Sequence, residues 1–194
     1  MQMDSNQNAI EEIRKLNELF KLKEVKRRGS VAGRPESSAE HSWSCIVLAE
    51  YFLPKLRQKI DEKKVIKMLL YHDLIEIKSG DTFFFDDKAT KNQKQKEYSA
   101  LEALRKSIPT QIFRDFIALW KEFDENKTTE AKFCNAIDKL DPIIQSAFSK
   151  FEWKKYKISE KLLREKKQPY FEPFPEINEV FEDFIEYAKK NKYF

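Results

Sequence analysis

Hydrophobic residues recur along most of the chain at intervals of three and four positions, which is the spacing of one buried face of an α-helix. The interval first appears after Ile10, and the helix that it predicts ends near Val25. Further helices are expected at 37–53, 62–77, 91–107, 110–123, 128–148, 159–167 and around 180–185. The pattern predicts an all-α fold.

Local signals mark where several of these helices begin and end. Ser37 and Glu40 have the spacing of a capping box, in which each side chain bonds the other residue's backbone N–H at a helix start. Gly80 is expected to end the helix that precedes it. Segment 27–35 holds two of the three glycines and a proline, so we expect a loop with an unusual backbone path. Three prolines at 169–175 predict a turn before the last helix.

Composition strengthens this prediction and removes several kinds of function. The 194 residues contain only three glycines, too few for the tight turns of a β-sandwich or barrel. The sequence has no glycine-rich phosphate-binding loop of the dinucleotide or Walker type. With 41% hydrophobic and 36% charged residues, and no linker or repeat, residues 1–194 are expected to form one helical domain.

Charge and cysteine content bear on partners and location. The net charge of +4 comes from 37 basic and 33 acidic residues that are interspersed, whereas a nucleic-acid-binding surface usually has a large basic excess. No window approaches the roughly 18 apolar residues of a membrane span, and the first residues lack the apolar core of a signal peptide. Two cysteines, Cys45 and Cys134, are too few for a disulfide framework. We therefore expect a cytoplasmic protein with neither a nucleic-acid nor a membrane partner.

The chain has only two histidines, and one of them is followed directly by an aspartate. His72-Asp73 lies between Tyr71 and Leu74 in an apolar segment that is expected to be a buried helix. A buried carboxylate is costly unless it is paired or bound to a metal. Imidazole and carboxylate are common ligands of divalent transition metals, and helix neighbours about 100° apart can reach one ion. A buried pair with a purely structural role is the alternative for the dipeptide alone.

Two more residues have the same character. His41 lies at the start of the preceding long helix, and Asp138 lies in the apolar helix for which Thr128 or Thr129 is the expected N-cap. Three helices would then bring His41, the His72-Asp73 pair and Asp138 to one point. Hydrophobic spacing alone does not establish this convergence.

The order of these residues along the chain resembles the signature of the HD-domain metal-dependent phosphohydrolases. Three segments also resemble motifs of the subgroup that includes the 5′-deoxynucleotidases: Pro-Glu-Ser-Ser-Ala-Glu-His-Ser-Trp at 35–43, the His-Asp, Glu and Gly-Asp residues of 71–81, and the helix at 130–140. The resemblance covers roughly residues 10–155 and leaves 156–194 as a C-terminal helical extension. It implies an HD-type helical bundle that hydrolyses nucleoside or deoxynucleoside 5′-monophosphates.

The resemblance also implies a metal centre. Its ligands would be His41, His72, Asp73 and Asp138, holding one divalent transition metal, which is Mn, Co, Fe, Ni or Zn. A catalytic centre of this kind keeps coordination positions open for water and substrate.

Three charged residues complete the implied site. Glu76 and Asp81 match the subgroup's acid/base and water-orienting groups, and the sequence does not decide which residue has which task. In the subgroup, an arginine in the loop before the first histidine contacts the phosphate, and a guanidinium matches the geometry of phosphate oxygens. Arg27 is the best match, with Arg28 and Arg34 as alternatives.

The substrate is less closely defined by the resemblance. Relatives usually have a tryptophan after the glycine that follows this arginine, whereas this chain has Ser30 there. The partner that the resemblance implies is a small phosphorylated molecule, most plausibly a nucleotide. A nucleoside triphosphate, an alarmone, or binding without catalysis are the alternatives.

Relatives of this kind are often homodimers, so we expect a homodimer here. The aromatic-rich segment 170–184 can either pack against the partner subunit or complete the core of the monomer. Trp43, Trp120 and Trp153 lie at apolar helical positions or helix ends and are expected to pack in the core.

Overall fold

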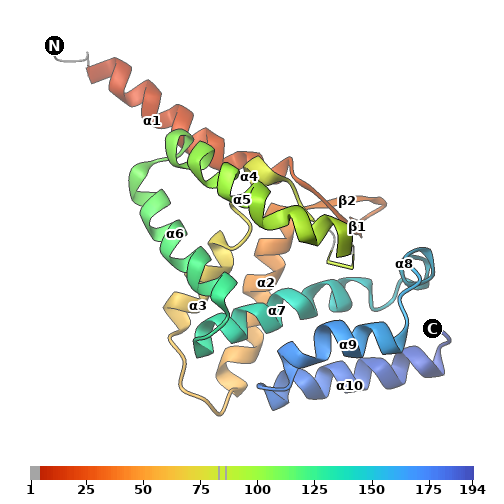
Figure 1. Cartoon of the computed structure of the whole chain (residues 1–194). Helices are drawn as coiled ribbons and strands as arrows, with labels where there is room; N and C mark the ends of the chain where they lie inside the picture. The colour runs from red at the N-terminus through yellow and green to blue at the C-terminus, as the bar shows by residue number, and fades with distance from the viewer. Residues whose placement is uncertain (1–4, 83, 86) are drawn as a thin grey trace. The chain divides into compact units, whose positions relative to one another are not determined.

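Helices form most of the structure, a computed structural model that describes residues 5–82, 84–85 and 87–194 (Figure 1). The chain divides into unit 1, residues 1–42 and 71–121, and unit 2, residues 43–70 and 122–194. The described residues form one sheet of only two strands, so the predicted all-α class is confirmed. Among these residues, no helix combines the length and apolar character that a membrane crossing requires.

Unit 1 is built around the turn that carries the His-Asp pair. Its elements are α1 (Ser5–Leu19), the 3₁₀-helix η1 (Phe20–Lys23), β1 (Lys26–Val31), β2 (Arg34–Ser37), the first turn of α2 (Ser38–Phe52), α4 (Glu76–Ser79), α5 (Asp87–Ser107) and most of α6 (Thr110–Glu125). Leu74 and Ile75 are buried in one core with residues of η1, α5 and α6, among them Leu104 and Phe116. Close packing of these two side chains fixes the backbone directly after His72 and Asp73.

The segment expected to be a loop between the first two helices is instead a β-hairpin. Strands β1 and β2 pair antiparallel, with Val31 opposite Arg34. Ala32 and Gly33 both have positive φ, at 50° and 81°, as in the two-residue turn that suits the right-handed twist of a hairpin. The sequence did not predict these strands because they are short and mostly polar, and Val31 is their only β-branched residue.

The predicted helix 62–77 is interrupted at the residues that carry the chemistry. Helix α3 (Glu62–Tyr71) ends before His72, residues 72–75 form a turn, and α4 follows. Within the turn, backbone hydrogen bonds join residues three positions apart instead of four. The N–H of Leu74 donates to the carbonyl of Tyr71, and the N–H of Glu76 donates to the carbonyl of Asp73. The pair therefore lies in a turn rather than inside a helix. Gly80 caps α4 as predicted, with a φ of 74°.

Unit 2 is a set of helices packed around α7. It contains the rest of α2, the 3₁₀-helix η2 (Leu53–Lys55), α3 up to Leu70, the end of α6, α7 (Thr129–Ser146), α8 (Lys150–Lys155), α9 (Glu160–Phe171) and α10 (Pro175–Lys190). Helix α7 packs against α9 and α10, and α9 packs against α10. Phe171, Phe174 and Phe181 are fully buried. The C-terminal aromatic segment thus completes the core of this unit.

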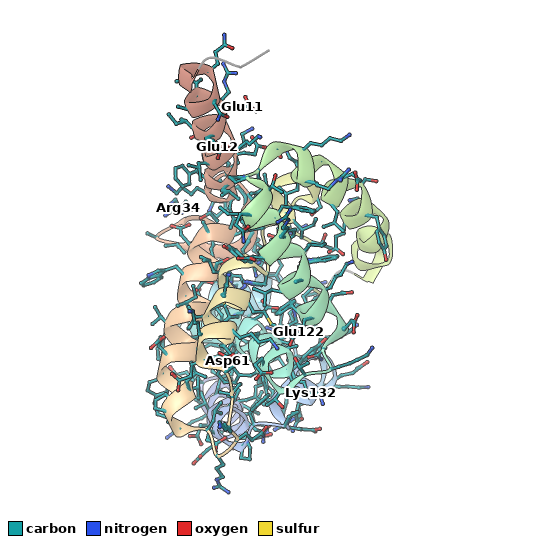
Figure 2. The ribbon with its side chains drawn as sticks, turned by 90° about the vertical axis from the view of Figure 1, so that its left-hand side faces the viewer. Glu11, Glu12, Arg34, Asp61, Glu122 and Lys132 are labelled. Carbon is teal, nitrogen blue, oxygen red and sulfur yellow. The ribbon has the colours of Figure 1, made fainter. Side chains whose placement is uncertain are left out.

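A polar network surrounds the N-terminus of α7. Thr128 is the N-cap, and its side chain accepts a hydrogen bond from the backbone N–H of Ala131 at 3.2 Å. The Thr128 hydroxyl in turn donates to Glu122, which also pairs with Lys64 of α3. The backbone N–H of Asp61 donates to Glu130 of α7; Asp61 and Glu122 are labelled in Figure 2. These contacts fix the start of the helix that carries Asp138.

Two smaller predictions were wrong. Pro169 does not form a turn but lies inside α9. Because proline has no N–H, the backbone carbonyl of Glu165 loses its helical hydrogen bond. Glu165 is exposed, so water can donate a hydrogen bond to that carbonyl instead. Trp43 is not in the core, because 67% of its surface is exposed. Trp153 is buried as predicted, and Trp120 packs against the core of unit 1.

Candidate active site

The hairpin decides which arginine faces the predicted site. Side chains along a strand alternate between its two faces, so Arg27 is half-buried whereas its neighbour Arg28 is exposed. Arg34, at the start of β2, is largely exposed and pairs with Glu40. The structure therefore brings Arg27 into the site, and it does not bring Arg28 or Arg34 there.

The predicted capping box positions the first histidine. The backbone N–H of Ser37 donates to the Glu40 carboxylate at 2.9 Å, and the backbone N–H of Glu40 donates to the Ser37 hydroxyl at 3.3 Å. This reciprocal pair fixes the start of α2. His41 is the next residue after Glu40, and no part of it is exposed.

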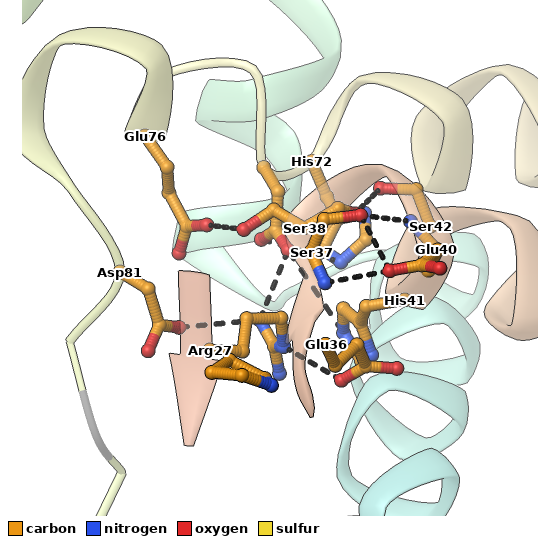
Figure 3. A network of polar contacts seen from close by, with 12 residues as sticks. Arg27, Glu36, Ser37, Ser38, Glu40, His41, Ser42, His72, Glu76 and Asp81 are labelled. Carbon is orange, nitrogen blue, oxygen red and sulfur yellow. Dashed lines mark hydrogen bonds and ion pairs between the residues drawn. The ribbon is translucent and has the colours of Figure 1, made fainter. Parts of the chain in front are cut away.

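Both histidines lie close together in unit 1 (Figure 3), and Asp73 belongs to the same unit. The imidazole centroids are 5.3 Å apart, and a ring nitrogen of each lies within 4.8 Å of one of the other. The Asp73 carboxylate lies between them: Oδ1 is 3.3 Å from Nε2 of His72, and Oδ2 is 3.9 Å from Nε2 of His41. All three residues are buried.

Arg27 joins three carboxylates at this point (Figure 3). Its Nη1 is 3.1 Å from Oδ2 of Asp73 and 3.3 Å from Oδ1 of Asp81. Its Nε is 3.3 Å from Oε2 of Glu36. One positive charge therefore faces three negative ones, and the group favours a further cation.

Glu76 occupies a different position in the same site. The Ser38 hydroxyl, fully buried at the start of α2, donates a hydrogen bond of 2.6 Å to Oε2 of Glu76. Burial, and next to it the negative charge of Asp73, raise the pKa of the Glu76 carboxyl well above its usual range. The nearby Arg27 opposes this shift only in part. Glu76 is thus suited to carry a proton, whereas Asp81 lies beside a guanidinium.

Asp138 belongs to unit 2 and lies in the middle of α7. It is buried, and its Oδ2 is 2.6 Å from Nζ of Lys139. Among the predicted ligands it is the one that the described geometry of unit 1 does not include. Its role as fourth ligand stays a prediction.

The donors in unit 1 match what a divalent transition metal requires. Two buried imidazoles, and a buried carboxylate whose oxygens lie 3.3 Å from one ring and 3.9 Å from the other, are ligands that Zn, Mn, Fe, Co and Ni accept. A buried carboxylate among buried rings is costly without such a partner. His41, His72 and Asp73 therefore fit a metal centre.

Sequence reasoning missed two residues of this network, Glu36 and Ser38. Both lie in the segment whose resemblance identified His41, but neither was given a role. For Glu36 a signal exists only through the hairpin, because the antiparallel pairing of Lys26 with Ser37 brings the neighbouring residues Arg27 and Glu36 to the same part of the two strands. That signal depends on the strand pairing, which the sequence did not predict.

The fold and the site together define a class: helical proteins with a histidine and carboxylate metal centre. Within that class the assignment is specific, because the family model described as HD domain matches residues 19–178. The chain belongs to the HD domain family.

Three known proteins illustrate the similarity. Proteins named 5′-deoxynucleotidase HDDC2 are 31% identical over 128 residues in Xenopus laevis and 33% identical over 135 residues in Dictyostelium discoideum. These matches cover 64% and 65% of this chain, and 62% and 70% of the relatives. A crystal structure described as a predicted metal-dependent phosphohydrolase, from Magnetospirillum magnetotacticum, has a TM-score of 0.86 and 25% identity. That match covers 100% of this chain and 98% of the other.

Proposed function

We propose that this protein is a metal-dependent phosphoric monoester hydrolase that acts on nucleoside and deoxynucleoside 5′-monophosphates. The observation that carries the proposal is the buried group of His41, His72 and Asp73, with Nη1 of Arg27 3.1 Å from the Asp73 carboxylate. The HD domain match and the names of the relatives support the same reaction class.

The proposed metal ligands are His41, His72 and Asp73 of unit 1 and Asp138 of unit 2. When bound, a divalent ion in such a centre offsets the charge of a phosphate oxygen and lowers the pKa of a bound water toward neutrality. Mn, Co, Fe, Ni and Zn all accept these ligands, so the ion is to be identified by elemental analysis.

Charged side chains of the protein are proposed to bind the phosphate, donate a proton and orient the attacking water. Phosphoryl transfer depends mainly on positioning and charge stabilisation. Arg27 is proposed to bind a phosphate oxygen through its N–H donors. Glu76 is proposed to give a proton to the leaving oxygen, which its burial supports, and Asp81 to orient the attacking water beside Arg27.

Alanine at His72 or Asp73 tests this proposal. Both variants should lose the bound metal and the hydrolytic activity while the far-ultraviolet circular dichroism keeps its helical form. Bound metal is measured by elemental analysis, and activity by phosphate release. A metal-free His72→Ala protein that hydrolysed substrate at the wild-type rate would show the proposal to be wrong.

The substrate is tested with a panel of phosphate esters. Nucleoside and deoxynucleoside monophosphates, nucleoside triphosphates and an alarmone are each assayed with Mn, Co, Fe, Ni and Zn in turn. We expect phosphate release from the 5′-monophosphates and little from the others. Faster hydrolysis of triphosphates or of the alarmone would show that the proposed substrate class is wrong. If the metal-bound protein hydrolysed none of these esters, a role in binding without catalysis would be favoured.

We also propose a homodimer in the cytoplasm. Trp43, Val47 and Tyr51 recur every fourth residue on α2 and are 67%, 47% and 57% exposed, which supports an apolar contact with a second subunit. Cys45 and Cys134 are both buried, and two cysteines are too few for a disulfide framework, which supports a reducing compartment.

A further inference from the structure

Glu36 is a buried carboxylate to which neither the sequence nor the comparisons give a role. It lies in β2, and only 3% of the residue is exposed. Removing a carboxylate from water is costly unless a partner compensates its charge. Its Oε2 lies 3.3 Å from Nε of Arg27, and the arginine side chain is itself mostly buried. The hairpin therefore keeps this pair in a largely desolvated place.

The donors of Arg27 are divided between two sides. Nε faces Glu36 within the hairpin, whereas Nη1 faces Asp73 and Asp81. A guanidinium is planar and rigid, so a contact at Nε restricts the direction in which the Nη groups point. Asp73 is a proposed metal ligand and Asp81 a proposed catalytic residue, and Figure 3 shows Asp81 and Glu36 on opposite sides of Arg27.

We propose that Glu36 is a positioning residue, which holds Nε of Arg27 so that the Nη groups meet the substrate phosphate. This inference rests on the proposed function, because it concerns the phosphate that Arg27 binds. Glu36 is not proposed to touch substrate or metal. Its effect should therefore appear only when Arg27 is present.

Glu36 can also act on a second residue, His41, and the experiment has to distinguish this role from positioning of Arg27. A carboxylate oxygen of Glu36 also lies within 4.8 Å of a ring nitrogen of His41. Carboxylates that orient a ligating histidine raise the affinity for the metal. A role through His41 would thus reduce metal affinity, whereas a role through Arg27 would reduce phosphate affinity at full metal occupancy.

The experiment is a double-mutant cycle on the metal-loaded protein. Glu36→Gln keeps the volume and removes the charge, Arg27→Gln removes the guanidinium, and the third variant combines both changes. Elemental analysis first establishes the metal content of each variant. Calorimetry then measures the dissociation constant for inorganic phosphate, and steady-state kinetics separates KM from kcat for a 5′-monophosphate.

We expect Glu36→Gln to keep its metal and to bind phosphate about tenfold more weakly, the lower end of what losing an orienting partner costs. KM should rise more than kcat falls. In the Arg27→Gln background, Glu36→Gln should add no further loss. Glu182→Gln is the matched control, because Glu182 also pairs with an arginine, Arg164, but lies outside the site. It should bind phosphate like the wild type.

Two results would overturn the inference: a loss from Glu36→Gln that is undiminished in the Arg27→Gln background, or a loss of metal from Glu36→Gln. If the Glu36→Gln protein does not fold, the Arg27→Lys protein is used in its place, with the same measurements of metal content and phosphate binding. Lysine keeps the charge but has no Nε donor to Glu36, so phosphate should again bind about tenfold more weakly, and wild-type binding would contradict the inference. Failure of the proposed function is distinct, since wild-type protein would then hydrolyse no ester.

Discussion

At the scale of single residues, the site is governed by how several carboxylates share one guanidinium. Asp73, Asp81 and Glu36 all contact Arg27, whereas Glu76 receives a hydroxyl hydrogen bond from Ser38. The three carboxylates that contact the arginine share its single positive charge. Burial, and next to it the negative charge of Asp73, raise the pKa of Glu76, and neither the Ser38 hydroxyl nor the charge of Arg27 offsets this rise.

That raised pKa predicts how stability depends on pH in metal-free protein. The folded state binds the Glu76 proton more tightly than the unfolded state does, where the pKa is near its ordinary 4.5. The contribution of Glu76 to stability is therefore fully present below pH 4.5 and is lost as the pH rises through the raised value. Glu76→Gln should be more stable than wild type at neutral pH, with the difference vanishing toward pH 4.5. Urea denaturation with a chelator present measures this.

Glu182 provides a control, because its pKa is shifted in the direction opposite to that of Glu76. Its hydrogen bond from Arg164 lowers the pKa of the Glu182 carboxyl, so its contribution is present above its ordinary pKa and is lost as the pH falls. Glu182→Gln should therefore be slightly less stable than wild type at neutral pH. A Glu76→Gln protein that was also less stable at neutral pH would contradict the account of Glu76.

At the scale of secondary-structure elements, the caps decide where the ligand-bearing helices begin. Thr128 and Thr129 were equivalent candidates in the sequence, and the structure assigns the N-cap of α7 to Thr128. Thr128→Ala should lower the free energy of unfolding by about 1 kcal/mol, because the backbone N–H of Ala131 loses its partner. Thr129→Ala should cost less. Urea denaturation of both proteins checks this, and an equal or reversed order would contradict the assignment.

Elements with a local sequence signal were predictable. The capping box of Ser37 and Glu40 and the end of α4 at Gly80 follow rules that involve residues close in sequence. The buried character of His72 and Asp73 also followed from their apolar neighbours. Each of these predictions needed only a short window of the chain.

What was not predicted depends on contacts between distant positions. The hairpin forms mostly from polar residues without a strand-like pattern, so the ion pair between Arg27 and Glu36 could not be predicted from the sequence. The break after Tyr71 lacks a proline or glycine, and the buried Leu74 and Ile75 fix the turn through packing on α5 and α6. Tertiary packing here overrides the helical periodicity of the sequence.

At the scale of the whole molecule, the apolar stripe of Trp43, Val47 and Tyr51 is the feature that bears on assembly. Stable protein interfaces bury about 800 Å² on each partner around a central apolar group. If this stripe is that group, Val47→Glu should convert a dimer into a monomer. Phe148→Glu, at an 86% exposed residue outside the stripe, should leave the dimer intact.

Sedimentation equilibrium of the three proteins measures this. A dimeric wild type with a monomeric Val47→Glu protein is the expected result. A dimer that Val47→Glu leaves unchanged would place the interface elsewhere, and a monomeric wild type would contradict the proposal of a dimer.

We propose that His41, His72, Asp73 and Asp138 hold one divalent metal. Anomalous diffraction from a crystal of the metal-loaded protein tests it most directly. We expect a single anomalous peak with the two imidazole nitrogens and a carboxylate oxygen of each aspartate about 2.0–2.2 Å away. A peak elsewhere, or an Asp138 carboxylate remote from the two histidines, would contradict the claim.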